Sequence, residues 1–163
     1  TPFDIHLMLE DPEFIIGCLN LSENDYVTLH AELPEDIFRK NMALIKEKKA
    51  RVGIALNPET PIEAIEKYVN DIDLILLMLV RPGFAGGKMI EGIMDKVPQT
   101  RAYLAQKGRE DVLVSTDGNI TLERAKLMAQ MGADIFVGGT SAVFRKGMDI
   151  AETVPAFYQY IAE

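Results

Sequence analysis

The sequence predicts an α/β fold in which parallel strands alternate with helices. Short runs rich in Val, Ile and Leu recur along the chain, and each is followed by small or polar residues and then by a longer segment with helical periodicity. Each helix must carry the chain back to the same end of the sheet, so consecutive strands run parallel. This order is typical of an open doubly wound sheet or of a (β/α)8 barrel, and in both the ligand lies at the carboxyl ends of the strands.

Six strand–helix units follow one another without a low-complexity tract or a linker, which indicates a single domain over residues 1–163. The predicted strands are residues 3–9, 26–30, 51–56, 74–80, 112–116 and 135–138. The predicted helices are residues 12–20, 34–48, 61–69, 90–107, 121–131 and 150–162. The strands are apolar almost throughout, as expected for a sheet that is covered on both faces.

Residues typical of helix ends support several of these limits. Thr60 precedes Pro61, which fits the first turn of a helix, and Thr121 precedes the apolar positions of the segment that follows it. Gly108 and Gly132 stand where two helices should end, because glycine adopts the left-handed conformation that closes a helix.

The composition disfavours several classes of protein. Seventeen Lys and Arg against 25 Asp and Glu give a net charge of −8, which disfavours nucleic acid and anionic membranes as partners. No segment approaches the roughly 18 apolar residues of a membrane span, so we expect a cytoplasmic protein without membrane contact. The one cysteine, Cys18, excludes an internal disulfide and a multi-thiolate zinc site, and we expect it to be a small core residue.

Polar side chains lie at the strand ends where a ligand would bind. His6 lies on the first strand, and His30 and Glu32 stand at the end of the second. Both histidines of the chain therefore fall in this group, although a buried histidine with satisfied hydrogen bonds is an equally good interpretation of His6. Asp117 follows the fifth strand and precedes Gly118, so its carboxylate should point into the mouth of the sheet unless it only forms a turn.

Two glycine-rich turns can bind a small anion. In PGFAGG, residues 82–87, and VGGTS, residues 137–141, residues without a Cβ can adopt backbone angles that turn several N–H groups toward one ligand. We expect the second turn to begin a helix, whose N-terminal partial charge would favour phosphate. A tight strand-to-helix turn explains either motif alone. Together they fall on the last strands of the series, where barrels often bind phosphate.

Six segments together resemble one enzyme family. DIHLMLEDP, YVTLHAE, GIALNPETPIE, LMLVRPGFAGGKMI, STDGNI and GADIFVGGTSAVF are similar, in this order and over essentially the whole chain, to ribulose-phosphate 3-epimerases and the closely related allulose-6-phosphate 3-epimerases. The resemblance implies a (β/α)8 TIM barrel with a divalent metal cofactor, most often zinc but also iron, manganese or cobalt. It also implies a small-molecule sugar phosphate as substrate and a homo-oligomer, either a dimer or a hexamer.

The resemblance assigns roles to individual residues. It makes His6 of the HLM motif and Asp117 of the DG motif metal ligands, and it makes Asp117 a catalytic acid and base as well. Met8 and Met78 would line the substrate pocket, although a methionine that fills a gap in the core is as good an interpretation of Met78. The other substrate-binding residues that it implies are Gly83, Gly86, Gly118, Asn119, Gly139, Thr140 and Ser141.

These residue types fit the chemistry of epimerisation at C3. Two acids on opposite faces of a ketose phosphate can remove and return the proton beside the C2 carbonyl, which converts ribulose 5-phosphate into xylulose 5-phosphate through an enediolate. A divalent cation offsets the negative charge of the enediolate, and a bound phosphate holds the reacting carbon in place. Arg81 stands where the family usually has Asn or Asp, and Asn119 where it usually has a second glycine, so the preferred sugar phosphate stays open.

The family's other metal-binding histidine, its opposing aspartate and a serine lie on two barrel strands that have no counterpart in this sequence. The predicted units correspond to strands three to eight, so we expect the chain to be part of a longer one and to be inactive alone. The alternatives are an allulose-6-phosphate 3-epimerase, an inactive phosphosugar-binding barrel, and another phosphate-binding barrel such as a hexulose-6-phosphate synthase or a tryptophan-pathway isomerase. The HLM histidine and the DG aspartate disfavour the last group, because those isomerases lack such a metal site.

Overall fold

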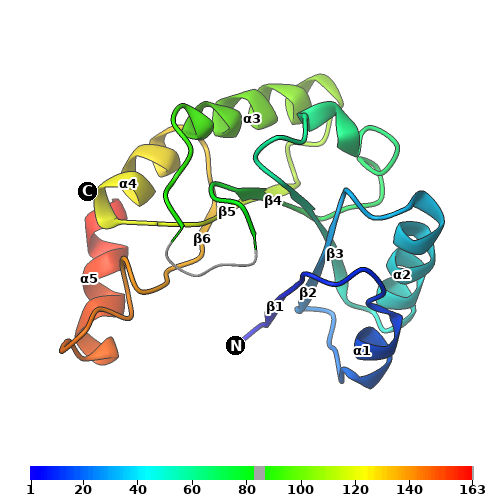
Figure 1. The fold of residues 1–163 in the computed structure, drawn as a ribbon, viewed down its shortest axis with the longest axis horizontal. Helices are drawn as coiled ribbons and strands as arrows, with labels where there is room; N and C mark the ends of the chain where they lie inside the picture. The colour runs from blue at the N-terminus through cyan, green and yellow to red at the C-terminus, as the bar shows by residue number, and fades with distance from the viewer. Residues whose placement is uncertain (83–86, 163) are drawn as a thin grey trace.

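The computed structural model describes residues 1–82 and 87–162. Its strands form one sheet in chain order, and each strand pairs in parallel with the next (Figure 1). The strands are β1 (Asp4–Leu7), β2 (Tyr26–His30), β3 (Arg51–Leu56), β4 (Leu74–Met78), β5 (Leu113–Asp117) and β6 (Ile135–Phe136). All their limits lie within two residues of the predicted ones, and the predicted parallel α/β fold is confirmed.

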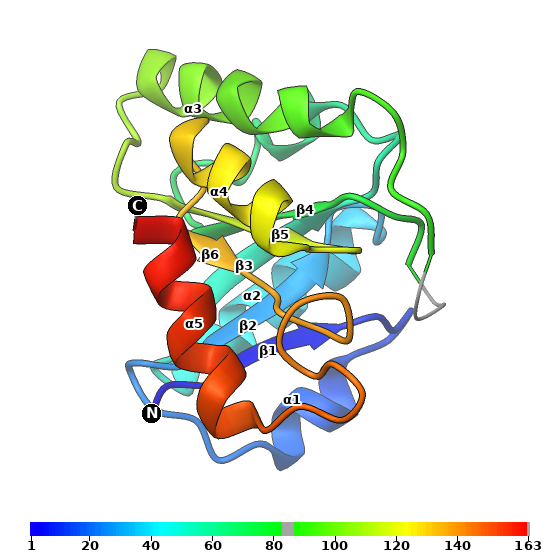
Figure 2. The same cartoon turned by 90° about the vertical axis from the view of Figure 1, so that its left-hand side faces the viewer.

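The helices lie outside a curved sheet whose inner face is open on one side (Figure 1). They are α1 (Glu13–Cys18), α2 (Glu35–Glu47), α3 (Lys96–Gln106), α4 (Leu122–Gln130) and α5 (Ile150–Ala162), with the short 3-10 helices η1 (Ile62–Ile65) and η2 (Ile93–Asp95). Figure 2 shows α4 and α5 in front of the β6 end of the sheet. The sheet is therefore an arc with helices around its convex face, as in a partial (β/α) barrel.

Apolar side chains cover both faces of the sheet. On the outer face, Val27, Ile54 and Leu77 belong to the main hydrophobic core, which continues into the helices through Phe38 and Leu104. The smaller cluster on the inner face consists of Ala55, Leu74, Leu76 and Met78. Successive residues of a strand point to opposite faces, so burial on both faces explains why the strands read as unbroken apolar runs.

Three expectations about single elements are wrong. The predicted helix 61–69 is only the 3-10 helix η1 followed by turns, since its backbone hydrogen bonds join residues three apart. The predicted helix 90–107 begins in α-helical form only at Lys96, because Gly92 has a left-handed backbone (φ 74°) that interrupts a right-handed helix. Cys18 is exposed rather than in the core, because the short helix α1 buries a single side chain.

Other boundary signals are confirmed. The Thr121 hydroxyl accepts a hydrogen bond from the N–H of Arg124 (3.3 Å) and so caps the first turn of α4. Gly108 and Gly132, just beyond α3 and α4, have φ angles of 66° and 105°. Both glycines therefore adopt the left-handed conformation that the sequence predicts for helix ends.

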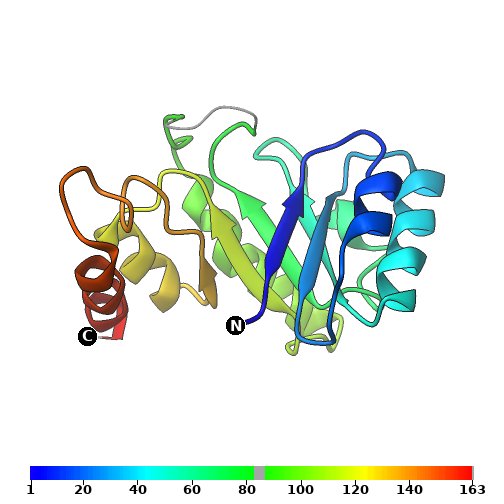
Figure 3. The same ribbon diagram turned by 90° about the horizontal axis from the view of Figure 1, so that it is seen from below.

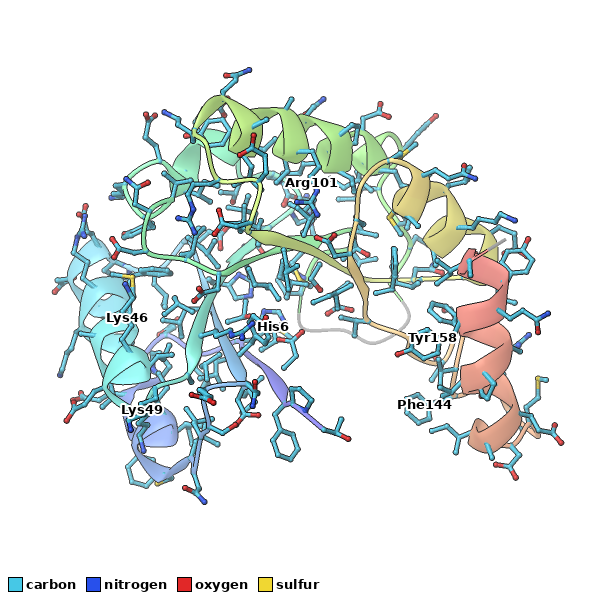
Figure 4. All side chains as sticks on the ribbon, turned by 180° about the vertical axis from the view of Figure 1, so that it is seen from behind. His6, Lys46, Lys49, Arg101, Phe144 and Tyr158 are labelled. Carbon is cyan, nitrogen blue, oxygen red and sulfur yellow. The ribbon has the colours of Figure 1, made fainter. Side chains whose placement is uncertain are left out.

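The arc ends at β1 and β6, and large apolar side chains are exposed near both ends. Phe14 is 77% exposed near β1, and Phe144 and Tyr158 are 60% and 72% exposed near β6. Figure 3 looks into the open side of the arc, and Figure 4 shows Phe144 and Tyr158 on the side of α5 that faces this opening. None of the helices in residues 1–82 and 87–162 has the length and apolar character that crossing a membrane requires.

Candidate functional site

The polar residues at the strand ends lie on the inner face of the arc. In β1, Ile5 and Leu7 pack in the outer core, so His6 between them faces inward (Figure 4). The same alternation turns His30 of β2 and Asp117 of β5 inward. The side chains that the sequence predicts to act together therefore share one face of the sheet.

The strand register, together with the usual stagger of a barrel, predicts a similar height along the barrel axis for His6 and Asp117. The strand pairing leads from His6 across β2, β3 and β4 to Leu113, which lies four residues before Asp117. A (β/α)8 barrel has a shear of about 8 over its eight strands, so each strand is shifted by about one residue relative to its neighbour. Four steps around such a barrel correspond to an offset of about four residues, the number that separates Leu113 from Asp117. The sheet thus places an imidazole and a carboxylate from distant parts of the chain on one face.

His6 is hydrogen-bonded to the second histidine. Nε2 of His6 lies 2.8 Å from Nε2 of His30, and Nδ1 of His30 lies 3.0 Å from Oε2 of Glu32. Loss of hydration, with a smaller effect of His30, lowers the pKa of His6 to about 4, so this imidazole is neutral at pH 7. Burial alone would raise the pKa of Glu32, but hydrogen bonds from His30 and from the loop after β3 lower it to about 2. That carboxylate is therefore ionised.

Asp117 ends β5 with its carboxylate in a poorly hydrated position. Burial raises the pKa of Asp117, and a hydrogen bond from the backbone N–H of Gly118 offsets part of this effect. Loss of hydration also raises the pKa of Asp4 on β1, and the charge of Asp117 raises it further. The charge of Asp117 thus reaches Asp4 across the inner face. A cation would stabilise the ionised form of Asp117.

A cavity of about 490 Å³ opens beside Asp117 at the strand ends. The predicted site residues that line it are Met8, Met78, Asp117, Gly118, Asn119, Gly139, Thr140 and Ser141. Arg81 also borders this cavity, whereas His6 is not among the lining residues. Gly83 and Gly86 lie outside the described residues. The structure therefore gathers most of the predicted site around one cavity.

The DG turn after β5 contains two residues with left-handed backbone angles. Gly118 has a φ of 118°, and a Cβ there would lie 2.7 Å from Cγ2 of Val80, so only glycine fits. Asn119 has a φ of 51°, a left-handed conformation that asparagine tolerates better than most residues. Its side-chain amide donates to the Gly87 carbonyl (3.1 Å), and its Oδ1 accepts from Arg124 (2.8 Å). These contacts hold the turn in place without the second glycine that is usual in this motif.

The turn after β6 differs from the expected start of a helix. The carbonyl of Gly139 accepts hydrogen bonds from three of the N–H groups that follow, at 2.9 to 3.2 Å, but the next helix, α5, begins only at Ile150. The expectation of a helix macrodipole at this turn is therefore wrong. Within the described part of the chain, no group accepts a hydrogen bond from the N–H of Thr140 or Ser141. Both N–H groups can thus bind an anion in the cavity.

His6 and Asp117 supply one nitrogen and one oxygen donor that suit a divalent cation such as zinc, iron, manganese or cobalt. The neutral state of His6 and the desolvation of Asp117 both fit a cation held by the two side chains. Within residues 1–82 and 87–162, no group of three or more His, Cys, Asp or Glu side chains is arranged to hold a metal. These residues thus offer two of the roughly four ligands of a complete site.

Residues 1–144 match the sequence profile of the Ribulose-phosphate 3 epimerase family. The chain belongs to this family. It is 38% identical over 143 residues to the ribulose-phosphate 3-epimerase of Bacillus subtilis, an alignment that covers 88% of this chain and 65% of that relative. The ribulose-phosphate 3-epimerases of Serratia marcescens and Escherichia coli K12 are 36% and 34% identical, each over 88% of this chain and over 67% and 63% of their own lengths. The chain thus spans about two thirds of these relatives.

Solved structures show the barrel fold of this epimerase-family chain. The 3-hexulose-6-phosphate synthase of Salmonella typhimurium superposes with a TM-score of 0.62 at 16% identity, over 94% of this chain and 66% of the other. The tryptophan synthase alpha-subunit of Pyrococcus furiosus superposes with a TM-score of 0.54 at 16% identity, over 85% of this chain and 54% of the other. At such low identity the likeness concerns the fold alone. The predicted barrel class is confirmed as a partial barrel.

The sequence does not indicate some contacts that shape the site of this epimerase-family chain. His30 and Glu32 are predicted at a strand end, but their hydrogen bonds are not. Lys96 is only 8% exposed and donates to the carbonyls of Asn57 (2.9 Å) and Thr60 (2.6 Å), which fixes the loop after β3. A lysine at the start of a helix ordinarily lies in solvent, so the sequence around Lys96 does not predict that it is buried and bonded to this loop.

Proposed function

We propose that the protein containing this chain catalyses the metal-dependent epimerisation of a ketose phosphate at C3, with ribulose 5-phosphate and xylulose 5-phosphate as its substrate pair. The observation that supports this most is that His6 and Asp117 share the inner face of the sheet, and that Asp117 borders a cavity together with the turns after β5 and β6. Family membership supports the reaction class, since the named relatives are ribulose-phosphate 3-epimerases.

In this proposal, His6 and Asp117 hold the divalent cation, and zinc is the first candidate. When bound, the cation offsets the negative charge that develops on the two oxygens of the enediolate. His6 contributes an uncharged nitrogen, and Asp117 contributes a carboxylate whose poor hydration favours a cationic partner. The remaining ligands would come from residues outside this chain.

Asp117 is the proposed acid and base on one face of the sugar. Its carboxylate removes the proton from C3, and the electron pair of that C–H bond moves toward the C2 carbonyl to form the enediolate. A second acid on the opposite face then returns a proton to C3, which inverts the centre. Burial raises the pKa of Asp117, whereas a bound cation would favour the ionised carboxylate that removal of the proton requires. We place the second acid on a part of the barrel outside residues 1–163.

The two turns after β5 and β6 are the proposed phosphate site. Gly118, Asn119 and the turn 139–141 border the same cavity as Asp117, and the N–H groups of Thr140 and Ser141, which donate to no acceptor in the described residues, could donate to a phosphate there. Holding the phosphate fixes C3 beside Asp117. Local groups must supply this attraction because the chain carries a net charge of −8.

We also propose that these residues form strands three to eight of an eight-stranded barrel within a longer chain. The arc ends at β1 and β6 with apolar side chains exposed at both ends, such as Phe14 and Tyr158. Two further strand–helix units would pair with both edges and close the barrel. The alignments support this, because the chain spans about two thirds of its relatives.

The experiment follows the loss of deuterium from C3 of ribulose 5-phosphate in the full natural protein. We expect Asp117→Asn to slow this exchange by roughly 10²- to 10⁴-fold, the usual contribution of a general base. Asp36→Asn, an exposed change on α2, is the matched control and should keep the wild-type rate. Full exchange by Asp117→Asn would remove this residue from the mechanism. Phosphate binding by the wild type without any exchange would support the inactive phosphosugar-binding barrel instead.

A further inference from the structure

The cavity beside Asp117 has a single positively charged side chain among its described lining residues. Arg81 supplies this charge, and Asp117 supplies the one negative charge. The turn 139–141 offers the proposed phosphate site N–H donors, which carry no formal charge. A phosphate that enters the cavity therefore meets a carboxylate, in a chain with a net charge of −8, and Arg81 is the one compensating charge among these lining residues.

Arg81 stands between two neighbouring cavities. It borders the cavity of Asp117 and also a second cavity of about 540 Å³. Of these two cavities, Glu59 borders the second alone, and its Oε1 lies 2.6 Å from Nε of Arg81. Glu59 thus holds the guanidinium from the side of the second cavity.

This ion pair leaves most of the guanidinium available to a ligand. It occupies Nε, and no group in residues 1–82 and 87–162 accepts a hydrogen bond from the two terminal nitrogens of Arg81. The side chains of Arg81 and Glu59 are 79% and 54% exposed, so water screens their attraction and the pair contributes little to stability. A phosphate can therefore bind the terminal nitrogens, or displace Glu59, at a small cost.

We propose that Arg81 is a substrate-binding residue that supplies the positive charge for the phosphate group of the ketose phosphate. This inference rests on the proposed function, in which the phosphate lies against the turns after β5 and β6, and it adds the residue that balances the phosphate charge. The planar N–H fork of a guanidinium matches two oxygens of a phosphate. Glu59 then competes with the phosphate for the guanidinium and weakens phosphate binding.

The first test measures the affinity of inorganic phosphate for the full natural protein by ³¹P NMR titration. We expect Arg81→Gln to weaken phosphate binding by roughly 10-fold, the lower end of what a hydrogen bond to a charged group contributes, because this side chain is exposed. Arg81→Lys should restore part of the loss, since lysine keeps the charge but not the planar fork.

Arg39→Gln is the matched control for this titration. Nε of Arg39 lies 2.8 Å from Oε1 of Glu35 in an exposed pair on α2, and neither residue borders either cavity. Arg39→Gln therefore removes the same kind of ion pair and the same charge, and it should bind phosphate as the wild type does.

Glu59→Gln separates a charge effect from a structural effect. In this proposal the change frees the guanidinium and removes a negative charge, so phosphate should bind about two- to fivefold more tightly, which corresponds to the strength of an exposed ion pair. If the pair only tied the loops after β3 and β4 together, Glu59→Gln and Arg81→Gln would both bind phosphate more weakly. That result, wild-type affinity in Arg81→Gln, or no phosphate binding by the wild type would overturn the inference.

The exchange of C3 deuterium from ribulose 5-phosphate adds a kinetic reading. Arg81→Gln should raise KM by roughly 10-fold and leave kcat nearly unchanged, because the phosphate is bound alike in the ground state and the transition state. A fall in kcat at an unchanged KM would contradict the proposed role of Arg81. Absence of exchange in the wild type would overturn the proposed function, and the phosphate titration would still decide the role of Arg81.

Discussion

At the scale of single residues, the inner face depends on glycine where two strands approach closely. Thr28 of β2 is fully buried and pairs directly with Gly53 of β3. A Cβ at Gly53 would lie 2.1 Å from Oγ1 of Thr28 and 2.9 Å from its Cβ. Rotation of the Thr28 side chain could move Oγ1, but the contact with its Cβ can be relieved only by a shift of the backbone. The identity of residue 53 is therefore set by its neighbour on the adjacent strand.

We predict that Gly53→Ala lowers the free energy of unfolding by about 1–3 kcal/mol, the usual effect of overpacking a core. Urea unfolding of the full natural protein measures it. Gly17→Ala is the matched control, because a Cβ at Gly17 meets nothing within 4 Å. Alanine should stabilise that helical position by about 0.5–1 kcal/mol. Equal stability of Gly53→Ala and the wild type would contradict the packing argument.

At the scale of elements, helical periodicity in the sequence does not always predict where a helix forms or begins. The segment 61–69 has helical periodicity but forms turns, and Gly92 delays the start of α3. Thr121, by contrast, acts through its own nearest neighbours and caps α4 as predicted. A helix or strand is thus predictable where the residues that determine it are close neighbours in the sequence.

Asp25, in the loop that joins α1 to β2, shows how one side chain can connect two elements. Its carboxylate accepts hydrogen bonds from the N–H of Phe3 (2.7 Å) and from the N–H and hydroxyl of Ser22 (both 2.7 Å). The hydrogen bond from Phe3 is the largest of the effects that lower the pKa of Asp25 below its ordinary value of 3.8. The ionised carboxylate thereby ties the start of β1 to the sheet.

We predict that the stabilising effect of Asp25 depends on pH. Its pKa is lower in the folded than in the unfolded chain, so its contribution is complete above pH 3.8 and is lost as the pH falls through the folded value. Asp25→Asn should therefore lower the urea midpoint at neutral pH, and its difference from the wild type should narrow below pH 3.8. The exposed change Asp36→Asn serves as the control. A difference that does not vary with pH would show that Asp25 acts through its shape rather than its charge.

At the scale of the whole molecule, the arc presents half of a site and two uncovered edges. His6 and Asp117 lie on its inner face, while Phe14 and Tyr158 are exposed near its ends. Exposed apolar surface and unpaired strand edges favour association with further chain. These uncovered edges support the proposal that residues 1–163 act as part of a larger barrel.

We predict that residues 1–163 produced alone exchange no C3 deuterium, whereas the full natural protein does. The reason is that the arc carries one acid and two metal ligands of the proposed site. A chelator should abolish the activity of the full protein, and zinc, iron, manganese or cobalt should restore it. Equal activity of the 163-residue chain, or an intact mass of 18.1 kDa for the natural protein, would contradict the proposal of a longer chain.

The sequence by itself determined the order of strands and helices, and its resemblance to one enzyme family added the barrel class and most residues around the cavity. These features have local signatures: apolar runs for buried strands, glycine and aspartate where strands end, and a capping threonine before a helix. The tertiary structure alone decided that His6 meets His30 and Glu32, that Asp117 shares the inner face with His6, and that Asn119 is held by Arg124. Register between strands and contacts across loops result from packing both faces of a sheet at once, and no short stretch of sequence contains that information.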